Sequence, residues 1–272
     1  WLKFAYGLKA RYTMRLSHRT PAYNDVISFA NNSFASANEQ AQFNYDGSSA
    51  YSPFYRFFTD RDYLGASQSF YDKLDERNDP RLDEFWVANP NAGEFELAPN
   101  GEPEQIQGRY AISALSVADA PTYLLSYHEI EFLKAEAYVR LGGAANIELA
   151  ETALRNAVSA AFQKVNVGLT AEDAEAYFDA FVLPLFTANP LSEVMNQKYI
   201  AFFEEEALEA YNDYRRLKAM GNDVIELANP KNATQFPLRF TYGAADVTTN
   251  FNVRDAYGDG TYVYTENVWW AG

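Results

Sequence analysis

The chain has 272 residues, a formal charge of -15 at pH 7 and an aromatic content of 16%, and its length is ample for a substantial hydrophobic core. The negative charge argues against a nucleic-acid ligand, because phosphates demand clustered Lys and Arg side chains, whereas a neutral ligand remains compatible with it. The absence of Cys excludes disulfides, thiol catalysis and Cys-based metal sites, and without an apolar run of about eighteen residues no membrane-spanning helix is expected.

The chain opens inside a helical pattern. Trp1, Phe4, Leu8 and Tyr12 recur at the spacing of one helical face. Because the first residue is not Met, we expect an N-terminal portion to be missing from this sequence. The packing partner of the opening helix is expected to lie in that portion.

A long irregular stretch follows between Asn31 and about Leu115, where Gly, Asn, Ser, Pro and aromatic residues dominate. One helix, from about Leu64 to Leu74, is expected within it. A stretch of this length without regular structure is uncommon in a compact domain unless it is functional or disordered. Its aromatic content argues against disorder. Residues 31–115, called here the excursion, are therefore predicted to fold as a loop-rich ligand-binding region.

Two helical hairpins are expected after the excursion. The first pairs a helix over Tyr123 to Leu141 with a helix that Asn146 caps, and Gly142 and Gly143 separate the two. The second begins with a helix over Ala171 to Phe186, which Pro184 is expected to end or kink.

The second helix of that hairpin is predicted as one long amphipathic helix over Asn196 to Gly221. Apolar residues recur along it at steps of three and four, glutamates precede its basic residues, and Gly221 supplies a stop. Glu204, Glu205 and Glu206 are interpreted as a solvated face of this helix. The tail from Phe236 to Trp270 is expected to be irregular.

Five segments in order resemble landmarks of the SusD-like (SusD/RagB) family of nutrient-binding lipoproteins. The segment over residues 196–221 is similar to the family's late signature, which has a QK pair, a glutamate-rich turn and paired arginines. The other four are WLKFAYGLKARYTMRLS (1–17), NDPRL (78–82), LSYHEIEFLKAEAYVRLG (125–142) and VWW (268–270). FPLRFTYGAADVTTN (236–250) resembles a further family segment, but Gly243 and Ala245 stand where the family has Pro and Glu.

The resemblance implies a mainly α fold, a tetratricopeptide-like scaffold of helical hairpins with long loop excursions. It implies a single SusD-like domain over residues 1–272 that forms the C-terminal portion of a longer chain. It also implies a lipid-anchored protein on the extracellular face of the outer membrane that binds a nutrient. Oligosaccharide is the nutrient class expected for this family. The implied partner is a SusC-like TonB-dependent transporter.

Aromatic side chains bind sugars by stacking on the apolar C–H face of a pyranose ring, while neighbouring polar side chains hydrogen-bond the hydroxyls. The excursion contains both kinds. The candidate ligand-binding residues are Asn44, Tyr51, Tyr55, Arg56, Asp60 and Trp86. Tyr and Trp have polar groups that suit partly exposed sites, whereas Phe54, Phe57 and Phe58 are interpreted as a local core beneath the loop.

Other chemistry has weaker support. His128 lacks a second His four residues later, so the metalloprotease helix motif is absent, and Asp255 and Asp259 are interpreted as part of a turn rather than a calcium loop. Paired arginines Arg215 and Arg216, and Arg81, are assigned structural roles. No catalytic residue, metal or cofactor is predicted. The alternatives left open are a helical glycoside hydrolase or lyase, which needs two opposed carboxylates, and a scaffold or adhesin without a small ligand.

Overall fold

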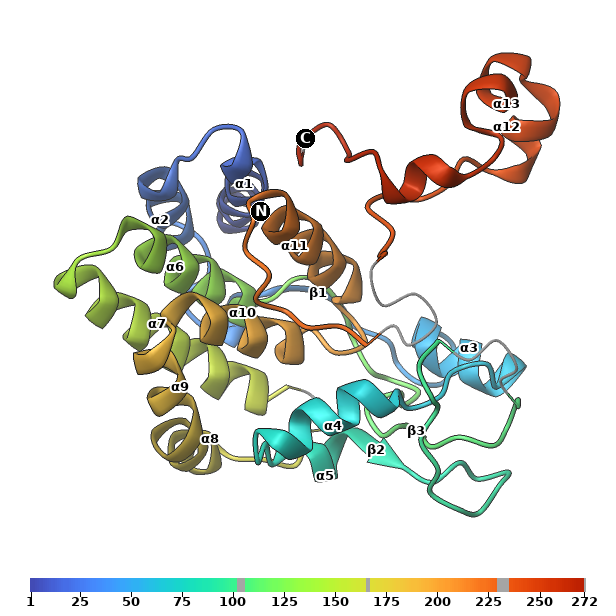
Figure 1. Ribbon diagram of the computed structural model, residues 1–272. Helices are drawn as coiled ribbons and strands as arrows, with labels where there is room; N and C mark the ends of the chain where they lie inside the picture. Colours follow the sequence, from blue (N-terminus) through green and yellow to red (C-terminus); the bar gives the residue numbers. More distant parts are fainter. Residues whose placement is uncertain (102–105, 165–166, 229–234, 272) are drawn as a thin grey trace.

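The computed structural model describes residues 1–101, 106–164, 167–228 and 235–271. In these ranges the chain is mainly α-helical, and packed helices form its body (Figure 1). The predicted fold class, a mainly α scaffold of helical hairpins with irregular excursions, is confirmed.

The N-terminal layer consists of three helices in mutual contact. They are α1 (Leu2–Arg15), α2 (Tyr23–Asn31) and α6 (Tyr127–Leu141), and a 3-10 turn (Leu16–His18) follows α1. Met14, Val26 and Ile130 meet in the core between them. Helix α1 therefore packs against partners within this chain, contrary to the expectation that its partner is missing, and α2 was not predicted.

Helices α6 and α7 (Ala144–Phe162) form the most extensive helix pair of the fold. Gly142 and Gly143 separate them with φ angles of 69° and 84°, a left-handed region that favours glycine. The hairpin is as predicted, with two corrections at the ends of its helices. Tyr123 lies in a strand before α6, and Asn146 lies inside α7, where its side chain donates a hydrogen bond to the Gly142 carbonyl rather than capping the helix.

The next helices continue the stack. They are α8 (Ala171–Tyr177), a π-helical segment (Phe178–Val182), α9 (Leu183–Ala188) and α10 (Pro190–Ala201). The side chain of Thr170 caps α8 together with Asp173, an arrangement that satisfies two backbone N–H groups. Pro184 was expected to end or kink the helix. It does not end the helical run, which changes from π-helical to α-helical just before it, because it lies in the first turn of α9, where a missing N–H costs little.

The long helix predicted over Asn196 to Gly221 is in fact two helices. Helix α10 ends at Ala201, and α11 (Ala207–Ala219) begins after a five-residue turn. Glu204 has a φ of 68° in that turn. The Lys164 ammonium group donates hydrogen bonds to the carbonyls of Ala201 (3.2 Å) and Phe203 (3.3 Å), which satisfies backbone groups that the break leaves without helical partners.

The excursion is less irregular than predicted and contains several short elements. They are a 3-10 turn (Ala37–Glu39), β1 (Ala41–Phe43), α3 (Pro53–Arg61), α4 (Gln68–Glu76), α5 (Arg81–Phe85), β2 (Trp86–Val87) and β3 (Ile112–Ser113). Strand β1 pairs antiparallel with β4 (Thr122–Leu125), and β2 pairs antiparallel with β3. The predicted helix at residues 64–74 is α4, which begins at Gln68 because the side chain of Ser67 caps it.

The tail also contains helices that were not predicted. They are α12 (Ala244–Thr249), α13 (Phe251–Tyr257) and a 3-10 turn (Thr261–Tyr264). Helices α12 and α13 stand away from the packed body in Figure 1. Among the helices that the structure describes, none combines the length and hydrophobicity that a membrane crossing requires.

Candidate functional site

Helix α3 carries three of the six predicted ligand-binding residues, Tyr55, Arg56 and Asp60. It begins with Pro53, whose fixed φ suits a first helical position, and it ends at Asp62, which adopts a left-handed φ of 49°. None of its side chains is buried. The helix therefore lies on the surface, held in part by the backbone hydrogen bond from Ser52 N to the Ala118 carbonyl (2.9 Å).

Four of the predicted residues meet at this helix. The rings of Tyr51 and Tyr55 stack at a centroid distance of 5.8 Å and an interplanar angle of 16°. The Arg56 guanidinium carbon lies 5.2 Å from the centre of the Tyr51 ring, and Arg56 also forms an exposed ion pair with Asp60 (3.8 Å). We call Tyr51, Tyr55, Arg56 and Asp60 the tyrosine face.

The other two predicted residues lie elsewhere. Asn44 is exposed just after β1, where its side-chain oxygen accepts a hydrogen bond from Gln42 (2.7 Å). Trp86 is 8% exposed in β2, so the expectation that it is partly exposed beside the tyrosines is wrong. Its burial results from edge-on packing against Phe203, at a centroid distance of 4.7 Å, and from further contacts with Phe70 and Phe85.

The phenylalanines of α3 are not the local core that the sequence suggested. Phe54 and Phe58 are partly exposed, and Phe57 is 44% exposed. Because Phe54 and Phe58 are one helical turn apart, they share a face of α3, and both line a pocket behind that helix.

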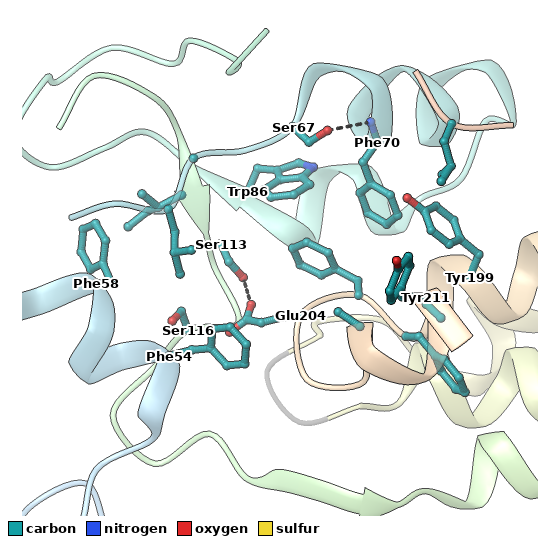
Figure 2. A pocket seen from close by; sticks show the side chains of 18 of the residues that line it. Phe54, Phe58, Ser67, Phe70, Trp86, Ser113, Ser116, Tyr199, Glu204 and Tyr211 are labelled. Atoms are coloured by element: carbon teal, nitrogen blue, oxygen red, sulfur yellow. Dashed lines mark hydrogen bonds between the residues drawn. The ribbon is translucent and has the colours of Figure 1, made fainter. Parts of the chain in front are cut away.

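This pocket has a volume of about 410 Å³ and lies between the excursion and the scaffold (Figure 2). One wall comes from α3, β2 and β3, and the other from the end of α10, the turn after it and α11. The aromatic residues of the lining are Phe54, Phe58, Phe70, Trp86, Tyr199, Phe202, Phe203, Tyr211 and Tyr214. Tyr199, Phe203 and Tyr214 belong to the apolar stripe of the predicted helix, whereas Tyr211 does not. The break between α10 and α11, which directs these rings toward the excursion, had no signal in the residue pattern.

The turn between α10 and α11 places three glutamates in three different environments. Burial raises the pKa of Glu204, whose carboxylate accepts a hydrogen bond from Ser113 in the pocket wall. Burial also raises the pKa of Glu205 to about 7, with the neighbouring Glu204 charge as a further cause. Burial would raise the pKa of Glu206 as well, but the nearby His128, Lys164 and Ser126 lower it to about 2. The prediction that these residues form one solvated helix face is wrong.

Glu205→Gln is expected to stabilise the protein at pH 8 and to have little effect at pH 4. The pKa of Glu205 is raised from 4.5 to about 7, so the folded state binds the proton more tightly and loses stability as pH rises between these values. Both carboxylate oxygens are buried without a hydrogen-bond partner among the described residues. Allowing for solvent screening of this partly exposed group, the gain is about 1–2 kcal/mol.

Urea denaturation of Glu205→Gln between pH 4 and pH 8 measures this effect. The control is Glu148→Gln, which changes an exposed glutamate of α7. A gain that is the same at both pH values, or that the control reproduces, would contradict the assignment.

The remaining charged candidates have structural partners. His128 is 2% exposed, and its Nε2 lies 2.6 Å from the Glu206 carboxylate. Arg81 is buried and donates from Nε to Asp79 (2.8 Å) and from Nη2 to Gln197 of α10 (2.8 Å), so it fixes the excursion to the scaffold. Arg216 is fully buried, as its assigned structural role requires. Within the described ranges, no group of three or more His, Asp or Glu side chains is placed to hold a metal ion.

Comparison with known proteins identifies proteins that are similar to this chain in sequence and fold. A family model of the SusD-like group, described as starch-binding and associating with the outer membrane, matches residues 1–243. A SusD/RagB family protein from Bacteroides thetaiotaomicron is 42% identical, with a TM-score of 0.84 over 100% of this chain and 64% of that one. A solved chitin-binding protein is 21% identical, with a TM-score of 0.73 over 100% and 64%. A SusD homologue from Bacteroides fragilis is 19% identical, with a TM-score of 0.70 over 100% and 67%.

Stacked helical hairpins with an aromatic-rich excursion form a tetratricopeptide-like scaffold. The chain belongs to the SusD-like family. It spans 64% of the length of the Bacteroides thetaiotaomicron structure. No curated protein sequence matches it.

Proposed function

We propose that this protein captures oligosaccharide on the extracellular face of the outer membrane and delivers it to a SusC-like TonB-dependent transporter. Membership of a family described as starch-binding and associating with the outer membrane is the observation that carries this proposal. A lipid anchor would hold the protein at the membrane, and residues 1–272 would form one domain of a longer chain. The excursion, residues 31–115, would be its ligand-binding region.

Within the excursion we assign the glycan to the tyrosine face. The stacked rings of Tyr51 and Tyr55 provide an apolar platform for the C–H face of a pyranose, because aromatic side chains supply a large contact area at a small cost in side-chain entropy. Arg56 and Asp60 lie on the same helix and are more than half exposed, so they can hydrogen-bond sugar hydroxyls. Asn44 would add a polar contact to the glycan at the edge of the tyrosine face. Trp86 would contribute as a lining residue of the pocket behind α3 and not as an exposed stacking platform.

A binding role rather than an enzymatic one is proposed for this face. Asp60 is paired with Arg56 one helical turn away, which suits a side chain that hydrogen-bonds a ligand. Glycoside hydrolysis needs two carboxyl groups facing each other across the scissile bond at roughly 5 to 10 Å.

Tyr51→Ala and Tyr55→Ala are each expected to weaken oligosaccharide binding about tenfold, because each removes one half of the stacking platform. Affinity electrophoresis on neutral polysaccharides followed by isothermal titration with derived oligosaccharides measures the change. Tyr12→Ala is the matched control, since Tyr12 is an exposed tyrosine with an arginine, Arg15, 5.9 Å from its ring on helix α1.

Two results would overturn the proposal. Retardation that neither tyrosine substitution alters would remove the tyrosine face as the site. Turnover of the oligosaccharide that a single Asp or Glu substitution abolishes would show that the protein is a glycoside hydrolase or lyase and not a binding protein.

A further inference from the structure

The pocket behind α3 is a second place where a ligand can bind, and its chemistry differs from that of the tyrosine face. Its volume of about 410 Å³ lies within the range of roughly 300–1,000 Å³ that is typical of small-molecule sites. Figure 2 shows Phe54 and Phe58 on one side of the space, with Tyr199 and Tyr211 on the other and Trp86 above. Ring faces from two parts of the fold therefore surround one cavity.

Contacts between aromatic rings and with the backbone hold the two walls of the pocket in place. Phe203 stacks on Phe85 at 4.7 Å and on Phe70 at 5.2 Å, which fixes the excursion wall against the turn after α10. On the other wall, the Tyr211 hydroxyl donates to the Pro237 carbonyl (2.9 Å), and the Arg215 guanidinium carbon lies 4.3 Å from the centre of the Tyr211 ring. Rigid walls lower the entropic cost of binding, because little has to be ordered when a ligand enters.

The charges around the pocket restrict what it accepts. Among the described residues of the lining, Glu204 is the only one with a carboxylate or a basic group. Burial raises the pKa of Glu204 because the surroundings disfavour a negative charge, and they would disfavour a ligand carboxylate placed beside Glu204 for the same reason. The buried cations around the pocket already have partners: Lys164 donates to two backbone carbonyls, Lys198 pairs with Asp213 (2.6 Å), and Arg215 donates to Asn212. An anionic ligand would therefore have to compete for a cation that is already paired.

We propose that this pocket binds a neutral, flat, apolar ligand of one or two rings, and that it excludes the corresponding carboxylate. Aromatic stacking against Phe54, Phe58 and Tyr211 provides the attraction. The indole Nε1 of Trp86, a lining residue, is buried and has no hydrogen-bond partner among the described residues, so this wall contains one unpaired donor. This site does not depend on glycan capture at the tyrosine face.

The probes are 2-naphthol and 2-naphthoate, which carry the same ring system with and without a negative charge. Isothermal titration and saturation-transfer NMR on the 272-residue chain are expected to show saturable one-to-one binding of 2-naphthol, with a dissociation constant on the order of 0.1 mM. Binding of 2-naphthoate is expected to be at least about tenfold weaker, because the buried, largely apolar lining disfavours a negative charge.

Ala207→Trp tests the location. Ala207 is an exposed alanine at the first position of α11 and lines the pocket, so an indole there would fill the cavity without disturbing a buried core. Binding of 2-naphthol should fall more than about tenfold. Ala171→Trp is the matched control, because Ala171 is an exposed alanine at the first position of α8 and is not part of the lining. Phe58→Ala removes one wall ring from a helix without buried residues and should weaken binding several-fold.

Each failure has a distinct meaning. Equal binding of the two probes would overturn the neutral ligand class, and 2-naphthol binding that Ala207→Trp leaves unchanged would overturn the location. If the protein binds oligosaccharide but not 2-naphthol, the pocket assignment alone is refuted. If it binds 2-naphthol but not oligosaccharide, glycan capture is refuted and the pocket assignment stands.

Discussion

Replacing Arg216 with Met is expected to lower the free energy of unfolding by about 3–5 kcal/mol, because it removes the main cation of buried Glu136 and a second cation of Asp213. Arg216 is 0% exposed. Its two terminal nitrogens donate to the two Glu136 oxygens, each at 2.7 Å, and Nη2 also donates to Asp213 at 3.0 Å. A bidentate arrangement of this kind is stronger than a single ion pair and fixes the orientation of both side chains.

The effect is expected to be large because the arginine joins elements that are distant in sequence. Arg216 lies on α11 and Glu136 on α6, and a third contact, from Arg216 to the Ser17 hydroxyl (3.3 Å), reaches the turn after α1. Burial alone would raise the pKa of Glu136, yet the charges of Arg216 and Arg140 hold it well below its usual value. Removal of Arg216 would therefore leave a desolvated carboxylate with Arg140 alone.

Urea denaturation followed by circular dichroism measures the loss, and two comparisons define its cause. Arg155→Met removes a surface arginine that pairs with Glu175 and Asp179, and should cost less than about 1 kcal/mol. The double substitution of Arg216 and Glu136 by Met should recover about 1.5 kcal/mol or more relative to Arg216→Met, because the uncompensated charge is gone. If the double variant is less stable than the single one, lost packing rather than a stranded charge is the cause.

The sequence predicted those parts of the fold whose determinants are local. The hairpin of α6 and α7 follows from two apolar stripes and the pair Gly142 and Gly143, all within about 40 residues of chain, and the structure places it as expected. The tyrosine face is local too. Tyr51, Tyr55, Arg56 and Asp60 lie within ten residues of each other, so one short helix and the two residues before it are enough to bring them together.

The features that escaped prediction depend on contacts between distant residues. The stripe of Tyr199, Phe203, Ala207 and Tyr214 keeps its period across the break between α10 and α11, so the pattern favoured one helix. The break is stabilised by Lys164, almost 40 positions earlier, and by the contact of Glu206 with His128, 78 positions earlier. Periodicity contains no information about such partners.

The position of Trp86 has the same kind of cause. An aromatic residue in a Gly-rich and Asn-rich stretch is equally compatible with an exposed platform and with a buried ring, and the outcome depends on what covers it. Here Phe203 covers it from the scaffold, more than 100 positions later in the chain. The pocket could not be predicted either, because its two walls belong to segments that only the folded chain brings together.

Phe203→Ala is accordingly expected to lower the free energy of unfolding by about 3 kcal/mol, the usual cost of removing a phenylalanine from an aromatic cluster. The Phe203 ring contacts three rings of the excursion: Phe70, Phe85 and Trp86, at centroid distances of 5.2, 4.7 and 4.7 Å. Each such pair contributes about 0.5–1.5 kcal/mol beyond simple burial. The residue lies in the turn after α10, so these contacts join the excursion to the helical scaffold.

The loss should therefore be uneven along the chain. Hydrogen exchange measured by mass spectrometry is expected to accelerate in α4, α5 and β2 of Phe203→Ala, whereas α6 and α7, which have their own core, should keep their protection. Phe57→Ala is the control, because Phe57 is 44% exposed on α3 and contacts Tyr63 edge-on at 6.2 Å. Its cost should stay below about 1 kcal/mol. Equal acceleration in α4 and in α7 would mean that the excursion and scaffold unfold as one unit, and that Phe203 is an ordinary core residue rather than the link between them.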